Sequence, residues 1–457
     1  MEFEGIKKYF ASLEPLPTAL FVLPFILLLG ALATLPLLAP RFWEKNRNKA
    51  VVSLGLGLPV AVFFLLKDWH TLASTLLDYL AFLSLLASLF IISGGIYIRG
   101  AFAGTPWVNT CFLLVGAFLA NFIGTTGASM LLIRPLLRAN QMRHRKSHIV
   151  IFFIFIVSNC AGLLTPLGDP PLFLGFLKGV NFTWTLRLLP EWLTIISALL
   201  VLFFLADEYH FRKEDPGVRR WTGAVEGWPP EVFGIEGGRN FFFLTLVIGL
   251  ILFSGQVLYP IEGPSLLGES FGSVLSKGVQ TLGMSVIAFL SYRMTSRVTH
   301  GRNNFGFGPM VEVAVLFAGI FLAMTPALII LETQGRGLGV THPWQFFWLS
   351  GGLSSFLDNA PTYLTFTSLA KGVLALKGEG LRELMTHPTG ALYLAAISSG
   401  AVMMGANTYI GNGPNFMVKA IAEESRVKMP SFFGYMAWSG TFLLPLFLVV
   451  TLCFFRS

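Results

Sequence analysis

The sequence predicts an all-α integral membrane protein built from two inverted copies of one unit. Its 457 residues are 54% hydrophobic and only 12% charged, with a mean hydropathy of +0.69. This composition is far more apolar than that of an ordinary globular protein. Apolar runs of about 20 residues, the length that a membrane-spanning helix needs, recur along the chain. Two of the longest runs are interrupted at corresponding places in the two halves, which is typical of inverted-repeat membrane folds.

The apolar runs predict about ten spans and two hairpins. Spans are expected near 17–39, 50–66, 71–97, 148–180 (interrupted), 188–206, 240–260, 271–292, 311–331, 388–424 (interrupted) and 431–454. Two further apolar stretches, 107–137 and 344–370, are broken near their middles, at Gly124 to Gly127 and at Asp358 to Thr362. Each half of these stretches is too short to span, so both are predicted to be re-entrant hairpins.

The two halves of the chain share one plan of three spans, a hairpin, an interrupted span and a final span. TPLGDPPLFL at 165–174 matches TYIGNGPNFM at 408–417, and NFIGTTGAS at 121–129 matches SFLDNAPTY at 355–363. Five spans per half is an odd number, so the second copy is expected to lie upside down relative to the first. We expect a first repeat at 1–206, a cytoplasmic linker at 207–239 and a second repeat at 240–457.

The distribution of charge and of cysteine argues against nucleic-acid binding, disulfide bonds and a cysteine metal site. Lys and Arg clusters lie between apolar runs, as in cytoplasmic loops, so the net charge of +8 does not indicate nucleic-acid binding. The three cysteines lack disulfide or metal-ligand spacing. The lipid bilayer is the expected partner, and a bacterial inner membrane is the expected location.

The interrupted run from Ser158 to Pro171 is the strongest functional signal. Three prolines and Gly168 prevent the helix from continuing, and the break contains Asp169. Irregular backbone within a membrane occurs where it is buried in protein or lines a watery cavity, and a carboxylate there is costly. Asp169 and Asp358 are the charged residues within the breaks, and both are candidate Na⁺ ligands. Lys178, about 15 Å beyond its break, is expected to extend to the membrane surface.

The candidate ion or substrate site combines these carboxylates with neutral oxygen and amide groups from both halves. Its predicted members are Asn121, Thr125, Thr126, Ser158, Asn159, Thr165, Gly168, Asp169, Asp358, Asn359, Thr362, Asn407, Thr408, Gly411, Asn412 and Asn415.

These groups suit transport of small ions. Na⁺ takes carbonyl, hydroxyl and carboxylate oxygens, and desolvation disfavours the charged form of an aspartate, so a proton and Na⁺ can compete for it. An organic anion could instead be held by half-helix N-termini and amide donors. The simpler alternatives are that each break is a kink and that Asp358 is a helix N-cap.

The motifs TPLGDPPLFLGF, LDNAPT and GNGPNFMVKAIAE resemble those of the ion transporter superfamily, which includes NhaD-type sodium/proton antiporters, arsenite-pump-like permeases and citrate transporters. The sequence is most similar to the sodium:proton antiporter and citrate transporter branch. The resemblance implies a homodimer, and it implies that each hairpin and its interrupted helix form an ion site in a domain that slides against a scaffold. One site would join Asn121 to Thr126 with Ser158 to Asp169, and the other Asp358 to Thr362 with Asn407 to Asn415.

Three functions follow as hypotheses. The first is a Na⁺/H⁺ antiporter that works by elevator-type alternating access, with Na⁺ and H⁺ as its ions and no other cofactor. The second is a Na⁺- or H⁺-coupled carrier of citrate or a similar anion. The third is an intramembrane aspartyl protease, although the residue two before Asp169 is Leu167 and not the glycine that such a motif needs. A transporter that is not an enzyme is the expectation.

Overall fold

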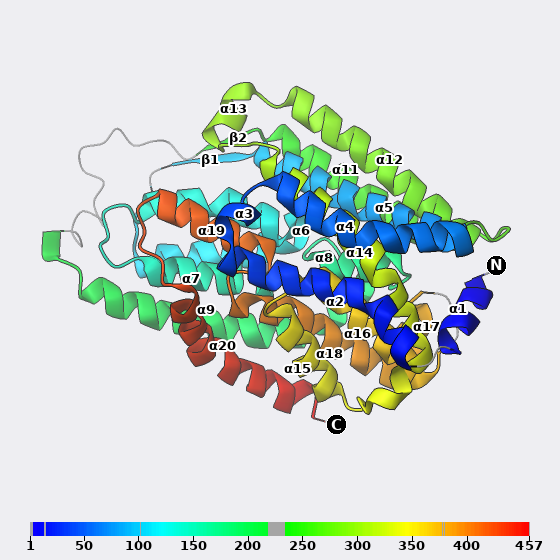
Figure 1. Cartoon of the computed structure of the whole chain (residues 1–457). Coiled ribbons are helices and arrows are strands. Elements are labelled where there is room, and N and C mark those ends of the chain that lie inside the picture. The colour runs from blue at the N-terminus through cyan, green and yellow to red at the C-terminus, as the bar shows by residue number, and fades with distance from the viewer. Residues whose placement is uncertain are drawn as a thin grey trace.

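The computed structural model describes residues 3–12, 15–100, 102–217, 234–376, 378 and 380–456. Within these ranges nearly all regular structure is helical (Figure 1). The strands among them, β1 (Tyr97–Arg99) and β2 (Gly234–Glu236), form an antiparallel pair. Among the described residues, ten helical segments are long and apolar enough to cross a membrane. The predicted all-α membrane class is therefore confirmed.

The elements of the first half include long helices at the predicted runs and short helices that were not predicted. They are α1 (Phe3–Ala11), α2 (Pro15–Leu38), α3 (Pro40–Trp43), α4 (Asn46–Lys67), α5 (Trp69–Gly94), α6 (Pro106–Ala139), α7 (Ser147–Ile156), the 3-10 helix η1 (Cys160–Leu163), α8 (Pro170–Leu177), the 3-10 helix η2 (Phe182–Leu188) and α9 (Leu189–Arg212). Helix α7 is apolar, and its residues from His148 to Ile156 are all buried. A helix with apolar residues on every side is typical of a protein core or of a membrane span.

Helix α6 is a hairpin. Gly124 interrupts it with a φ of 74° and a ψ of 158°, a left-handed conformation that favours glycine. Asn109 and Asn140, near its two ends, exchange side-chain hydrogen bonds of 3.0 and 2.7 Å. A straight helix of 34 residues would hold its ends roughly 50 Å apart. The two arms therefore run back along each other, as expected for the stretch 107–137.

The second half is also built from helical elements, apart from β2 before it. It contains α11 (Arg239–Phe253), the π-helical turn η3 (Ser254–Leu258), α12 (Phe271–Met294), α13 (Arg297–Arg302), α14 (Gly308–Gln334), the 3-10 helix η4 (Gly335–Leu338), α15 (Pro343–Ser354), α16 (Asn359–Leu374), α17 (Arg382–Thr386), α18 (Pro388–Met404), the 3-10 helix η5 (Gly405–Asn407), α19 (Gly413–Glu424) and α20 (Phe432–Phe454). Helices α15 and α16 are the arms of the second hairpin, and both contact α18.

Equivalent hydrogen bonds recur in the two halves. Thr165 donates to the Asn121 carbonyl at 2.5 Å, and Thr408 donates to the Ser355 carbonyl at 2.5 Å. These residues occupy the same places in the paired motifs. The agreement supports a duplicated unit, while the upside-down orientation of the second copy stays a prediction.

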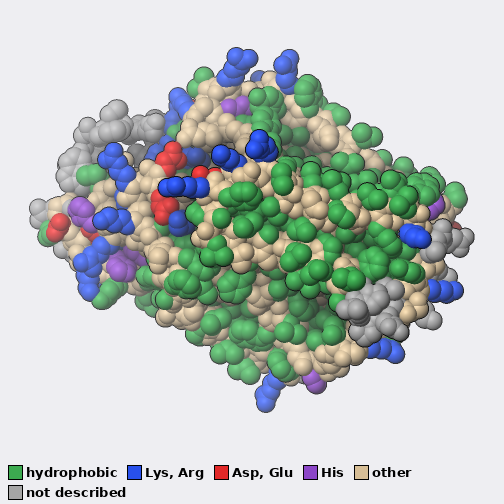
Figure 2. All heavy atoms as spheres, viewed as in Figure 1, with side chains coloured by type: hydrophobic (Ala, Val, Ile, Leu, Met, Phe, Trp, Pro, Cys, Tyr) green, Lys and Arg blue, Asp and Glu red, His purple; other side chains and the backbone are tan. Residues whose placement is uncertain are grey.

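The surface is apolar over much of its area. Figure 2 shows hydrophobic side chains spread across the face in view, with most of its Lys and Arg side chains toward the edges. Large apolar residues are highly exposed on several helices, such as Leu38 at 81%, Leu66 at 77% and Leu282 at 72%. Helices with such surfaces belong in lipid, where exposed apolar side chains carry no hydration cost.

The linker expected at 207–239 begins later than predicted. Helix α9 continues to Arg212, and Asp207 is fully buried within it. Residues 234–236 form β2, and 218–233 lie outside the described residues. The predicted span ended where the first charged residues interrupt the apolar sequence. The helix continues past this point because Asp207 is buried in ion pairs. The division into two repeats stays a prediction.

Candidate functional site

The two interrupted helices are broken at the predicted places, and tight glycine contacts shape each break. Helix α7 ends at Ile156 and α8 begins at Pro170, while α18 ends at Met404 and α19 begins at Gly413. A Cβ atom on Gly168 would lie 2.2 Å from the Gly162 carbonyl oxygen, and one on Gly411 would lie 2.5 Å from that of Gly405. Both breaks therefore need glycine for the close approach of two backbone segments.

Asp169 lies at the meeting point of the breaks and hairpin tips. Its side chain is only 1% exposed. Thr125 Oγ1 donates a hydrogen bond to Asp169 Oδ1 at 2.9 Å, and Asn359 Nδ2 donates to Oδ2 at 2.6 Å. Asn412 Nδ2 lies 3.5 Å from Oδ1. The carboxylate thus receives neutral donors from both hairpins and from the other interrupted helix.

Amide groups of both breaks form a second layer beside Asp169. Asn159 Nδ2 donates to Asn415 Oδ1 at 2.7 Å, and Asn412 Nδ2 lies 3.1 Å from Asn159 Oδ1. The hydroxyls of Ser129 and Ser158 are 2.8 Å apart. These side chains are all buried. The two halves therefore contribute side chains to one polar cluster.

Asp358 lies next to this cluster but turns to the backbone. Its Oδ1 accepts a hydrogen bond of 3.2 Å from the Ala360 amide, so it caps α16. Thr362 donates to the Asp358 carbonyl at 3.1 Å, within the same helical turn. The N-cap alternative thus describes what Asp358 does in this conformation, and its role as an ion ligand stays a prediction.

The remaining predicted residues support the breaks. Asn121 Oδ1 accepts from the Leu164 amide at 3.0 Å, and Asn407 Nδ2 donates to Ser355 Oγ at 2.9 Å. Both bonds tie a hairpin to its interrupted helix. Within the described part of the chain, the Thr126 side chain has no hydrogen bond to the other candidate residues. Thr126 therefore lies beside the cluster and is not part of its hydrogen-bond network.

Sequence reasoning missed a network of buried charges. Lys178, which was expected to extend to the surface, is 30% exposed but also pairs with Asp78 of α5, and Lys277 of α12 lies 2.6 Å from Asp78 and 2.5 Å from Glu269. Lys371 of α16 lies 3.1 Å from Glu332. The signal was available, because Asp78 and Lys277 each interrupt a predicted span and charges there are costly unless paired.

This network surrounds a cavity of about 160 Å³. Leu174 of α8 and Lys178 directly after it, together with Leu364 and Lys371 of α16, contribute to its lining. Helices α8 and α16 both begin at the Asp169 cluster and pack against each other. The cavity therefore lies farther along the two helices whose N-termini form the candidate site, and Asp169 is not part of its lining.

A second network that sequence reasoning missed joins the base of the first hairpin to α9. Arg143 and His148 contact Asp207 Oδ1 at 2.5 and 2.8 Å, and Asn109 donates to Asp207 Oδ2 at 2.8 Å. The side chains of Arg143 and Asp207 are 0% exposed. The pairing explains how a carboxylate can be buried inside an apolar helix, and it fixes the hairpin ends.

Comparison with known proteins gives one family. A family model described as "Putative citrate transport" matches residues 14–455, which is nearly the whole chain. No curated protein matches it. Together with the ten apolar helices, the family match identifies an integral membrane transporter. The chain belongs to the family described as "Putative citrate transport".

Proposed function

We propose that this transporter exchanges Na⁺ for H⁺ at Asp169 by alternating access. The observation that supports this most strongly is a buried carboxylate at the meeting point of two broken helices and two hairpins, whose hydrogen-bond partners among the described residues are neutral. An ionisable group inside a membrane protein is by default a functional group, because its burial is costly. Because no Lys or Arg in the described part of the chain pairs with Asp169, its negative charge is available to a cation.

The chemistry around Asp169 suits competition between the two ions. Unwound carbonyls and side-chain oxygens coordinate Na⁺ in transporters built from discontinuous helices. Here the Asp169 carboxylate, the Thr125 hydroxyl and the Asn159 amide oxygen are all near the break. A proton that neutralises the carboxylate removes its attraction for Na⁺, so one ion leaves as the other binds. The exchange needs no group other than the two ions.

Coupling would come from movement of this cluster across the membrane. We propose that the two halves are inverted repeats, that the hairpins are re-entrant, and that the site-bearing helices slide against the remaining helices in an elevator-type cycle. A homodimer in a bacterial inner membrane belongs to the same proposal and rests on the sequence resemblance.

The test is an ion jump in proteoliposomes that contain a pH-sensitive dye. A sudden Na⁺ gradient is expected to produce proton movement, and a choline gradient of equal ionic strength is the control. The absence of Na⁺-dependent proton movement in vesicles with folded, correctly inserted protein would overturn the proposal.

A second function, coupled uptake of citrate or a similar anion, is favoured by two observations. The first is the family match. The second is that α8, α16 and α19 all begin at the cluster, with Asp169, Asp358 and Asn412 at their N-cap positions. Helix N-termini carry partial positive charge and attract anions. Labelled citrate separates the two functions, because a simple Na⁺/H⁺ exchanger takes up none.

A further inference from the structure

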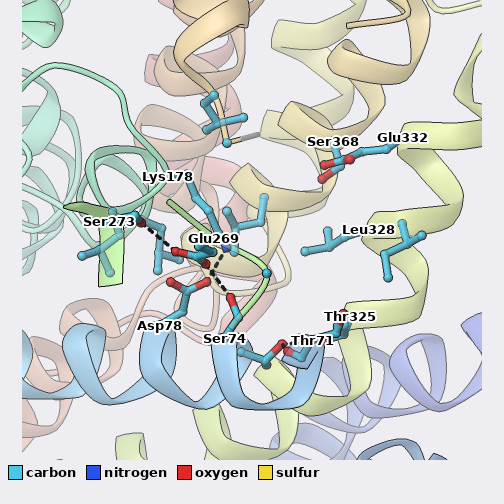
Figure 3. Close-up of a pocket in the computed structure, with 18 of the residues that line it drawn as sticks. Thr71, Ser74, Asp78, Lys178, Glu269, Ser273, Thr325, Leu328, Glu332 and Ser368 are labelled. Atoms are coloured by element: carbon cyan, nitrogen blue, oxygen red, sulfur yellow. Dashed lines mark hydrogen bonds and ion pairs between the residues drawn. The ribbon is translucent and has the colours of Figure 1, made fainter. Parts of the chain in front are cut away.

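The cavity beside α8 and α16 contains a carboxylate that comes from a loop. Glu269 lies in the segment between η3 and α12, and it projects among residues of three other elements (Figure 3). Figure 3 shows Glu269 between Ser74 and Ser273, with Asp78 nearby and Glu332 and Ser368 across the cavity. A loop side chain therefore occupies a position that the surrounding helices build.

The contacts of Glu269 form a complete carboxylate-binding arrangement. Ser74 of α5 donates to Oε1 at 2.5 Å, while Ser273 and Lys277 of α12 donate to Oε2 at 2.6 and 2.5 Å. Burial alone would raise the pKa of the Glu269 carboxyl, but Lys277 and Lys178 hold that pKa well below its ordinary value. Both oxygens are thus held by hydrogen bonds, and the bond from the Lys277 ammonium is charge-assisted and therefore strong.

The loop that carries Glu269 is bent into this position by an uncommon backbone conformation. Leu267 has a φ of 55° and Gly268 a φ of 76°, both in the left-handed region. Leu266 and Glu269 exchange backbone hydrogen bonds of 2.9 Å, so the two residues between them form a tight turn. Leu267, Gly268 and Glu269 all line the cavity. The turn therefore presents the Glu269 side chain to the cavity, where Ser74, Ser273 and Lys277 hold it.

The charges around the cavity favour an anion when Glu269 is absent. Four lysines line it, namely Lys7, Lys178, Lys277 and Lys371, together with the carboxylates of Asp78, Glu269 and Glu332. Without Glu269, two carboxylates face four lysines, which leaves an excess of two positive charges. A cavity with this excess matches a ligand with two or more negative charges.

We propose that Ser74, Ser273 and Lys277 form a carboxylate-binding site, occupied here by Glu269 as an internal substitute, that binds a small organic di- or tricarboxylate when Glu269 withdraws. The loop between η3 and α12 acts as the competitor, and its departure opens the site. This site is separate from Asp169, so it does not depend on Na⁺/H⁺ exchange.

The experiment removes the internal competitor. Purified full-length Glu269→Ala protein is titrated with choline citrate, choline tricarballylate and choline chloride, without Na⁺, while its thermal unfolding is followed. A ligand that binds the folded state raises the unfolding temperature. A site that Glu269 fills most of the time gains at least about tenfold in apparent affinity when Glu269 is gone. We therefore expect half-maximal stabilisation of the variant at a citrate concentration at least about tenfold lower than for the wild type.

Two controls separate this site from general anion effects. Glu262→Ala changes an exposed acid in the same loop and should respond to citrate as the wild type does. Adding Ser273→Ala to Glu269→Ala should weaken the citrate effect, because Ser273 is one of the donors. A Glu269→Ala response equal to that of the wild type, or one that chloride reproduces, overturns the proposal.

A second variant covers the case in which Glu269→Ala does not fold. Glu269→Gln keeps the size of the side chain but lacks the charge that competes for Lys277, so citrate should still stabilise it at lower concentrations than the wild type. A wild-type response from this variant overturns the proposal. Because Na⁺ is absent throughout, a negative citrate result does not bear on Na⁺/H⁺ exchange. A negative result in the exchange assay likewise does not bear on citrate binding.

Discussion

Asp169→Asn is expected to abolish coupled transport while the protein still folds. Asp169 Oδ1 and Oδ2 accept hydrogen bonds from Thr125 and Asn359. The substitution replaces one oxygen by an NH₂ group that now faces a donor. The Thr125 hydroxyl can rotate to accept, whereas reversing the Asn359 amide would break the 2.6 Å bond that Ser354 donates to its Oδ1. The new amide nitrogen should therefore face Thr125.

The effects on stability and on ion binding differ in size. Loss of a charge-assisted hydrogen bond costs about 1.5–3 kcal/mol, and relief of a charge inside the membrane returns about 2.5–3.5 kcal/mol. The free energy of unfolding should thus change by less than about 2 kcal/mol. Removal of one partner from a buried charge pair costs about 2–5 kcal/mol, so Na⁺ affinity should fall roughly 30- to 4,000-fold.

The assay combines thermal unfolding in detergent with Na⁺-driven proton movement in proteoliposomes. Asp215→Asn, which neutralises an exposed acid just beyond α9, is the matched control and should behave as the wild type does. If Asp169→Asn keeps Na⁺-dependent proton movement within a few-fold of the wild-type rate, the reasoning from this carboxylate is refuted. If the variant aggregates while Asp215→Asn does not, the carboxylate holds the fold together.

The other predictions concern single acids. Asp358→Asn should leave the unfolding temperature nearly unchanged, because Asn caps helices as well as Asp does. Na⁺-driven proton movement should nevertheless be lost. If this movement is retained, Asp358 acts as a helix cap and not as an ion ligand. Asp207→Ala should lower the free energy of unfolding by about 3–5 kcal/mol by leaving Arg143 buried and unpaired. Glu208→Ala, at an exposed ion pair of the same helix, should change the free energy of unfolding by less than about 1 kcal/mol. If Asp207→Ala and Glu208→Ala change this free energy equally, the buried ion pair does not have the stabilising role assigned to it. Because the Glu269 pKa lies below its ordinary value of 4.5, its contribution to stability is complete above that pH and declines as the pH falls below it. Wild-type protein should therefore lose more thermal stability than Glu269→Gln on acidification, and parallel losses would contradict the ion pairing.

The helix breaks could be predicted because their causes are local. Three prolines and Gly168 stop one helix, and Gly124 turns the first hairpin. Each effect acts within a few residues of its source, so a single sequence contains the information. The breaks in turn identify Asp169 as an acid in unwound backbone, which is why the centre of the candidate site could be named in advance.

The partners of those residues could not be predicted in the same way. Asn359 was a candidate, but its bond to Asp169 joins segments 190 residues apart, and no local pattern specifies that pairing. Lys178 was expected at the surface because distance from the break was considered without Asp78, which lies 100 residues away. Helix α1 and the β1–β2 pair were missed because they are short and lack a span's apolar length.

The bond between Asn359 and Asp169 also has a consequence for how two similar halves can share one centre. The second motif has Asn412 where the first has Asp169, and Asn412 Nδ2 lies 3.5 Å from Asp169 Oδ1. Two identical copies would place two acids at that separation, and their repulsion would force one of them to hold a proton. With asparagine at this one position, the second motif presents an amide dipole to Asp169 and not a second negative charge. The point where the two motifs meet thus holds the Asp169 carboxylate facing an amide, and Asp358 lies next to it.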